Sequence, residues 1–262
     1  MPICQAAMDP AGAADPRSLW LNSPDALIQV LCVVAMNGHD ARNFSSLSRA
    51  FRGDEVLWGC IKDRRGRDGG TVLMASSACG NLARVRWLLD RCADVNAVQM
   101  SNGLTSLMCA IVTGRLDVVR ELIGRGANVN AAQTGDEVDG FTTLMCACYK
   151  GRTEVVRELI GAGASVNAAQ TGDLSGMTAL IWTCHKGHLE VAHELLEHGA
   201  NVNALTGTGW TSLMLACREG HLEVAHFLLA HHASKATMSI TGRTAYDFTP
   251  VANAELRALV KP

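Results

Sequence analysis

Apolar and polar residues alternate along most of this chain in short blocks that have the period of an α-helix. In the block 189–196, which reads LEVAHELL, the apolar residues share one helical face and the charged residues fall between them. Such a pattern is typical of an amphipathic helix that packs against a neighbour by one face. A polar run, Ala200–Ala204, follows this block and predicts a turn after the helix.

The block returns along the chain, and each copy is preceded by a second apolar block that begins at a threonine. The string TSLM at 105–108 reappears as TTLM at 142–145 and as TSLM at 211–214. This threonine stands at six positions, which are Thr71, Thr105, Thr142, Thr178, Thr211 and Thr244. Subtracting neighbouring positions gives spacings of 34, 37, 36, 33 and 33 residues, which are typical of an array of helical repeats.

Threonine and glycine mark the ends of the helices in each unit. The threonine hydroxyl can cap the first helix by accepting a backbone N–H. Five units then have a glycine between their two helices, where the chain must reverse direction with a positive φ, namely Gly80, Gly114, Gly151, Gly187 and Gly220. In the middle units another glycine ends the second helix, at Gly126, Gly163 and Gly199.

A unit of helix, tight turn, helix and hairpin in about 33 residues resembles the ankyrin repeat, whose pattern contains T-P-L-H. The best matches are 187–191 and 220–224, which both begin G-H-L-E-V and are followed by a Leu-Leu pair. The resemblance covers about Asp68 to Val260. It implies an all-α, ankyrin-type helical solenoid over residues 67–262, with five repeats, a degenerate C-terminal cap and no substantial sheet.

The repeats depart from the family pattern in three ways. The Pro of T-P-L-H is missing from every copy and Met or Ile usually replaces its His, so we expect fewer polar contacts and more apolar packing between repeats. Cys92 and His232 stand where other repeats have a helix-ending glycine, which costs about 1 kcal/mol each if the left-handed conformation is kept. The two longest spacings predict longer hairpin tips at 131–139 and 168–175.

Residues 1–66 do not follow the repeat pattern. Residues 1–22 are rich in alanine and proline, and we expect them to be disordered. We expect residues 23–66 to form an N-terminal helical segment, and their sequence resembles the F-box, which binds the Skp adaptor of cullin-type ubiquitin ligases. The adaptor-binding residues implied by this resemblance are Pro24, Leu27, Ile28, Leu31, Leu47, Phe51 and Trp58. Ser23 departs from the F-box pattern, and the alternative is a helical cap on the first repeat.

Composition and charge narrow the classes of function and location. Of the 262 residues 48% are hydrophobic and 18% charged, and the net charge of −2 lacks the basic excess of nucleic-acid-binding domains. The longest apolar stretch, Leu27–Met36, is too short to span a bilayer. Because ten cysteines occur without a secretory signal, we expect free thiols and a cytoplasmic or nuclear location.

No pattern in the sequence points to catalysis, a cofactor or a metal. The chain has no G-x-S-x-G, P-loop or H-E-x-x-H string. Cys148, Cys184 and Cys217 occupy equivalent positions of first helices, where a cysteine serves as a small apolar side chain. His188 and His221 match the His of G-H-L-E, so we interpret both as structural.

The family resemblance also implies a binding surface on the hairpins and on the exposed side of the first helices. We expect a protein partner in a concave groove whose contact residues are Leu104, Phe141, Tyr149, Lys150, Met177, Trp182, His185, Lys186, Trp210 and Arg218. Exposed rings among cations would suit a segment with apolar anchors and acidic residues. The alternative is that these rings pack on neighbouring hairpins.

Two functions follow from these features. The first is a substrate receptor, whose repeats hold a client while the F-box-like segment docks a ubiquitin ligase. The second is a non-enzymatic scaffold whose N-terminal helices are only a cap.

Overall fold

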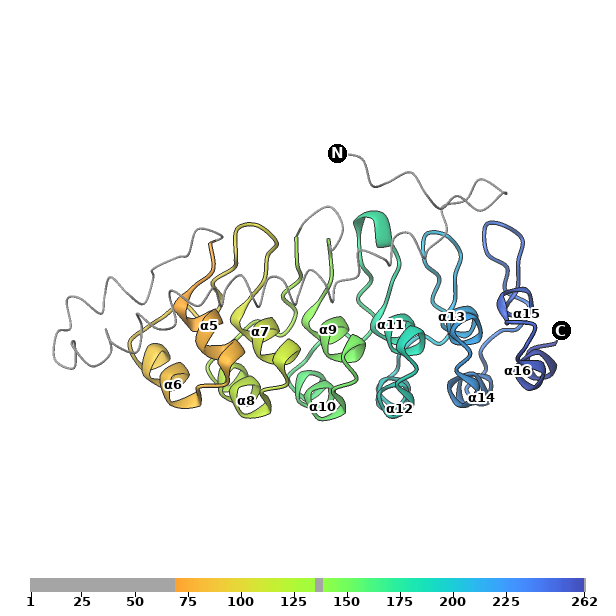
Figure 1. Cartoon of the computed structure of the whole chain (residues 1–262). Coiled ribbons are helices and arrows are strands. Elements are labelled where there is room, and N and C mark those ends of the chain that lie inside the picture. The colour runs from red at the N-terminus through yellow and green to blue at the C-terminus, as the bar shows by residue number, and fades with distance from the viewer. Residues whose placement is uncertain (1–68, 135–138, 262) are drawn as a thin grey trace.

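The computed structural model describes residues 69–134 and 139–261. This part of the chain is an elongated stack of helix–turn–helix units joined by hairpins that project from one side, as Figure 1 shows. The predicted F-box-like residues Pro24, Leu27, Ile28, Leu31, Leu47, Phe51 and Trp58 lie outside it.

Six units are present in the described residues, and we number these repeats from one to six in chain order. Their first helices are α5 (Val72–Cys79), α7 (Ser106–Thr113), α9 (Thr143–Tyr149), α11 (Ala179–Lys186), α13 (Ser212–Glu219) and α15 (Ala245–Phe248). Their second helices are α6 (Leu82–Asp90), α8 (Leu116–Gly124), α10 (Thr153–Gly161), α12 (Leu189–Glu197), α14 (Leu222–Ala230) and α16 (Ala254–Leu259). The all-α solenoid predicted from the repeats is confirmed.

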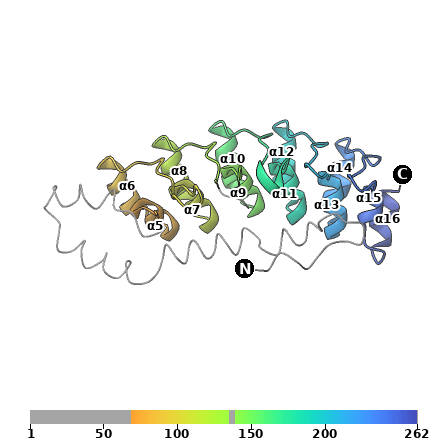
Figure 2. The same ribbon diagram turned by 90° about the horizontal axis from the view of Figure 1, so that it is seen from above.

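First and second helices form two rows along the stack (Figures 1 and 2). Second helices bury one face: α10 buries Val155, Val156 and Leu159 and keeps Glu154 and Arg157 exposed. First helices are buried nearly all round, and all seven residues of α9 are buried. A first helix packs against its own second helix and against the first helices on both sides, which leaves it little exposed surface.

The predicted threonine caps are present, and methionine takes part in two of them. Thr142 Oγ1 accepts the N–H of Met145 at 3.2 Å, while the Met145 sulfur accepts the Thr142 N–H at 3.5 Å. Thr71 and Met74 make the same pair. Methionine at the usual His position therefore keeps the reciprocal bond of a capping box, with a weaker acceptor.

The glycine between the helices is needed for two reasons, as Gly151 illustrates. Its φ is +64°, and a Cβ atom there would lie 2.6 Å from the His188 ring of the next repeat. The same ring donates from Nε2 to the Tyr149 carbonyl oxygen at 3.3 Å. The structural role predicted for the G-H-L-E histidine is thus a contact between repeats.

Asparagine side chains join the repeats at the loop after the second helix. Asn130 Nδ2 donates to the Gly163 carbonyl at 3.1 Å, and its Oδ1 accepts the Ser165 N–H at 2.8 Å. Asn96, Asn167 and Asn203 each make the same pair of contacts to the following repeat. Asparagine thus supplies polar contacts between repeats at a position outside the T-P-L-H string.

Ion pairs join neighbouring second helices. Arginine of one repeat meets glutamate of the next in the pairs Arg86–Glu121, Arg120–Glu158 and Arg157–Glu194, at 2.7–2.8 Å. In the following pair of repeats the equivalent residues are His193 and Phe227, whose rings stack with centroids 5.3 Å apart. A ring contact thus replaces the ion pair between α12 and α14.

The hairpins pair with one another through single backbone contacts. Antiparallel bridges such as Ala132–Thr142 close each of three hairpins. Successive hairpins are joined by bonds such as the Thr134 N–H to the Asn102 carbonyl at 3.1 Å. The described residues contain isolated bridges and no continuous strand, and the tip at 168–175 includes a short 3₁₀ helix, η1 (Gly172–Leu174).

Cys92 and His232 adopt the left-handed conformation that the repeat period predicts, with φ of +61° and +66°. We expect Cys92→Gly and His232→Gly each to raise the free energy of unfolding by about 1 kcal/mol, because glycine has no Cβ penalty there. Denaturant titration of each purified variant measures the change.

Gly126→Ala and Gly163→Ala are matched controls for this prediction. Both glycines end a second helix with positive φ, and a Cβ added at either meets no atom within 4 Å. Each alanine should therefore lower stability by about 1 kcal/mol through backbone strain alone. Unchanged stability in all four variants would contradict the predicted energetic cost of a side chain at these positive-φ positions.

Candidate protein-binding surface

The structure corrects the surface predicted from the sequence, because its apolar members are buried. Phe141 and Trp182 have no exposed surface, and Trp210 is 8% exposed. The full set of predicted contact residues that are buried is Leu104, Phe141, Tyr149, Met177, Trp182 and Trp210. Their predicted exposure was wrong, since all six side chains are buried.

Rings from the third and fourth repeats form one cluster. The Trp182 ring lies edge-on to Phe141 and Tyr149, with centroids 5.6 and 5.2 Å away. Its indole N–H donates to Gln170 Oε1 in the hairpin at 3.0 Å. Edge-to-face contacts of this kind, with the indole hydrogen bond satisfied, are typical of a well-packed interior. Helix α11 thus uses Trp182 to hold its hairpin and α9 together.

The other buried members also pack inside the stack. Leu104 belongs to a small apolar cluster with Met74, Ala78 and Met108 of the first two repeats. The Trp210 ring lies against Phe248 of the last repeat, with centroids 4.0 Å apart. Met177 is 3% exposed within the main core.

Among the polar members of the predicted set, Lys150 and Lys186 are half-buried and the Arg218 side chain is 8% exposed, and all three contact buried rings. Lys186 Nζ lies 4.4 Å from the Tyr149 ring centroid, and Lys150 Nζ lies 5.5 Å from the same ring. The Arg218 guanidinium lies 5.0 Å from the Trp210 centroid and 2.6 Å from a carboxylate oxygen of Glu219. Cation–π attraction therefore holds these cations at the ends of successive first helices.

His185 lies among these cations but is uncharged at neutral pH. Burial, followed by the charges of Lys186 and Arg218, lowers its pKa to about 3. Glu219 Oε1 lies 3.7 Å from Nδ1, beyond hydrogen-bonding distance. The His185 ring packs edge-on to Trp182, with centroids 6.3 Å apart. The positive charge of this surface thus comes from lysine and arginine.

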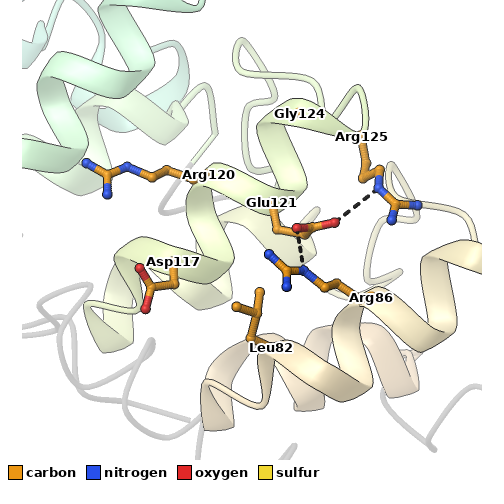
Figure 3. Close-up of a pocket in the computed structure, with 7 residues that line it drawn as sticks. All are labelled: Leu82, Arg86, Asp117, Arg120, Glu121, Gly124 and Arg125. Atoms are coloured by element: carbon orange, nitrogen blue, oxygen red, sulfur yellow. Dashed lines mark hydrogen bonds and ion pairs between the residues drawn. The ribbon is translucent and has the colours of Figure 1, made fainter.

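A depression of about 440 Å³ lies between α6 and α8 (Figure 3). Charged side chains line it, but they pair with one another: Arg86 and Arg125 both point at Glu121, at 2.8 and 3.1 Å. Arg120 pairs outward with Glu158. This depression therefore offers paired charges rather than polar groups that converge on a ligand.

Three buried cysteines of the first helices keep their thiols protonated. Burial raises the pKa of the Cys148 thiol to about 12 and that of Cys217 to about 11, so both stay protonated. Cys184 is shifted in the same direction for the same reason. Within 69–134 and 139–261, no group of three His, Cys, Asp or Glu side chains is placed to hold a metal ion.

Sequence reasoning missed two features of the surface. The asparagines that join repeats were read only as turn residues, although the strings NVN at 128–130 and at 201–203 repeat in register. Exposed apolar side chains occur on the hairpins instead of the inner helices, including Met100, Met238 and Ile240 at 81%, 63% and 68% exposure. No helix in the described residues is long and apolar enough to cross a membrane.

Trp182→Ala should lower the free energy of unfolding by about 3–5 kcal/mol, because it leaves a cavity among Phe141, Tyr149 and Gln170. Met100→Ala removes a large side chain that is 81% exposed and should change stability by less than about 0.5 kcal/mol. Denaturant titrations of both variants test the assignment of Trp182 to the core. Equal free energies of unfolding for the two variants would contradict the assignment of Trp182 to the core.

The lowered pKa of His185 predicts a pH dependence of stability. Below pH 6.5 the unfolded chain binds a proton at this residue while the folded chain does not, so stability falls as pH drops from 6.5 towards 3. Between pH 6.5 and 5 the loss should be about 1–2 kcal/mol. His185→Gln should flatten this part of the profile. Parallel wild-type and His185→Gln profiles would contradict the assignment.

Comparison with known proteins places this architecture in a family. A family profile described as "Ankyrin repeats (3 copies)" matches residues 31–133 and 144–239, which is more than half of the chain. The first match begins inside the segment 23–66, upstream of the repeats identified in the sequence. A comparison with curated proteins gave no match. The chain belongs to the ankyrin-repeat family.

Proposed function

We propose that this protein is a non-enzymatic interaction module that holds another protein along the inner row of its first helices and hairpins. The observation that carries the proposal is the row of charged side chains set on buried rings, at Lys150, Lys186 and Arg218. Lys150 and Lys186 stand at the same position of consecutive repeats, and Arg218 stands one position earlier in the fifth repeat.

The packing beneath this row supports binding. Tyr149, Trp182 and Trp210 are buried, so the rings that the cations contact have fixed positions. A surface that is already ordered loses less side-chain entropy when a partner docks. The hairpins are joined to one another by backbone hydrogen bonds and project beside the first helices.

A finer proposal concerns residues 23–66. The string L-S-R-x-F at 47–51 and the closing Leu-Trp at 57–58 support an F-box-like segment that docks a Skp-type adaptor, so that the repeats recruit a client to a cullin-type ubiquitin ligase. The family match from residue 31 onward favours the alternative, a scaffold in which this segment is an extra, degenerate repeat or cap. The free thiols of the described cysteines suit a cytoplasmic or nuclear setting for either function.

Co-purification of the full chain with a Skp-type adaptor distinguishes these two proposals. If the F-box-like segment works, the adaptor should co-purify with the wild-type chain and be lost from Leu47→Ala and Phe51→Ala variants. The scaffold proposal predicts no adaptor, while proximity labelling still recovers protein partners. Folding of each variant is checked by its melting temperature, because a cap residue would alter stability. A chain that recovers neither adaptor nor partner contradicts both.

A further inference from the structure

We propose that the sixth repeat, residues 244–261, is a latch that detaches from the stack as a unit while the other repeats stay folded, and that its detachment frees Arg218 of the fifth repeat. The sixth repeat contains α15 and α16 and lies at one end of the stack (Figure 1). A repeat is stabilised mainly by its neighbours, so one with weak contacts to its neighbour can open locally. This inference goes beyond the proposed function, and its test requires no partner.

The asparagine bridge is missing between the fifth and sixth repeats. Asn203 joins the fourth repeat to the fifth through two backbone groups, at 3.2 and 2.9 Å. The equivalent residue of the next repeat is Ala236, which has no amide to donate or accept a hydrogen bond. Lys235 Nζ instead lies 3.5 Å from the Lys261 carbonyl oxygen, which is a long contact for a hydrogen bond. The sixth repeat therefore lacks the contact that joins the repeats before it.

The second helices of the fifth and sixth repeats also lack the ion pair of the earlier repeats. Helices α14 and α16 align on their N-cap residues, His221 and Asn253. This alignment places His226 and Leu259 at the positions of the arginine and the glutamate. Because leucine carries no charge, no ion pair can form there. Moreover, α15 and α16 have four and six residues, so these short helices depend strongly on packing against the fifth repeat.

The side chain that covers the turn glycine is smaller at this junction. A Cβ atom at Gly187 would lie 2.6 Å from the His221 ring, whereas one at Gly220 would meet only Asn253 Nδ2, at 3.9 Å. His221 Nε2 also donates to the His185 carbonyl oxygen of the preceding repeat at 3.2 Å. Asn253 Oδ1 instead accepts a backbone N–H of its own helix at 3.1 Å. The contact of the second helix with the preceding turn is therefore looser in the sixth repeat.

Apolar contacts hold the sixth repeat closed, and they connect it to Arg218. Leu256 and Val260 have no exposed surface, and the Phe248 ring lies 4.0 Å from the Trp210 ring of the fifth repeat. The Arg218 guanidinium lies 5.0 Å from the same Trp210 ring, and its side chain is only 8% exposed. When the sixth repeat leaves, Trp210 loses its contact with Phe248 and becomes free to move. Opening should therefore expose Arg218, one of the three cations of the proposed binding surface.

Three buried cysteines of the chain report on the opening of successive repeats. Cys148, Cys184 and Cys217 occupy the same position of α9, α11 and α13, and none of them has exposed surface. Each thiol meets a hydroxyl side chain of the next repeat, respectively Thr183, Ser212 and Thr249. Only for Cys217 is this next repeat the sixth, so the other two cysteines are matched controls within the same molecule.

Alkylation of the native full chain with iodoacetamide, mapped by mass spectrometry, tests the latch. Each cysteine's rate is divided by its rate in the unfolded chain. Cys217 should then react at least about ten-fold faster than Cys184 and Cys148, because opening one repeat costs less than opening the stack. Its rate should also depend less on denaturant, since local opening exposes little surface. Three equal rates that rise together with denaturant would overturn the proposal.

Two variants separate the latch from general destabilisation. Phe248→Ala should raise the ratio of the Cys217 rate to the Cys184 rate by about ten-fold more, because it removes the ring contact with the fifth repeat. Leu122→Ala opens a cavity in α8 of the second repeat, at a fully buried position, and should not raise this ratio. An equal rise in both variants contradicts the latch. Loss of the helical circular dichroism of the whole chain in Phe248→Ala contradicts it too, since the sixth repeat would then not be separable.

Modification of arginine by phenylglyoxal tests the release of Arg218. Its rate should follow that of Cys217 with denaturant and should rise with it in Phe248→Ala, whereas the exposed Arg152 should react at the same rate in both proteins. Fast alkylation of Cys217 while Arg218 stays protected would contradict the coupling of the latch to the surface. None of these labelling rates depends on a partner, so their failure leaves the interaction module standing, and recovery of no partner leaves the latch standing.

Discussion

An asparagine amide bridges each of the first four repeats to the next, and the stack depends on the register that these amides set. Asn130 illustrates the contact: it donates to one backbone carbonyl and accepts from one backbone N–H of the following repeat. A repeat of this kind cannot bury its apolar faces alone, so its stability comes from its neighbours. Two bonds from one side chain fix both the distance and the angle between consecutive repeats. Backbone hydrogen bonds between successive hairpins also fix the spacing of the repeats. The first helices are packed between these hairpin bonds and the asparagine contacts.

Helix ends and turns could be predicted from the sequence because each depends on one residue and its immediate neighbours. Threonine caps, positive-φ glycines and even the left-handed Cys92 and His232 followed from the repeat period. Burial of the first helices could not be predicted by the same reasoning. The family pattern describes where partners bind and does not say which side chains fill the space between repeats. The composition of α9, TLMCACY, was informative: a helix that is apolar all round is buried all round. That rule would have placed Tyr149 in the core.

Methionine illustrates how a substitution can change the chemistry of a position and keep its role. The family's Pro is missing and its His is usually replaced, which predicts fewer polar contacts and more apolar packing between repeats. In the structure the sulfur atoms of Met74 and Met145 accept hydrogen bonds from the backbone N–H groups of the capping threonines. Asparagine joins the repeats at another place. Both contacts lie on loops and caps, where hydrogen bonding is specified by a single side chain. Sequence patterns of hydrophobicity carry no information on such bonds, so they became visible only once neighbouring repeats were placed side by side.

The buried rings connect the fold to the binding surface. Tyr149 packs edge-on to Trp182 on its inner side and carries Lys150 and Lys186 on its outer side. A change in the core at Trp182 would therefore move the cations above it, although no partner touches the indole. Stability and recognition are thus coupled in the third and fourth repeats, where the rings are most numerous. In the first two repeats Met74, Leu104 and Met108 form the corresponding buried cluster, which contains no aromatic ring. Lys150, Lys186 and Arg218 are consequently constrained by the core, since each contacts an aromatic ring that is buried in it.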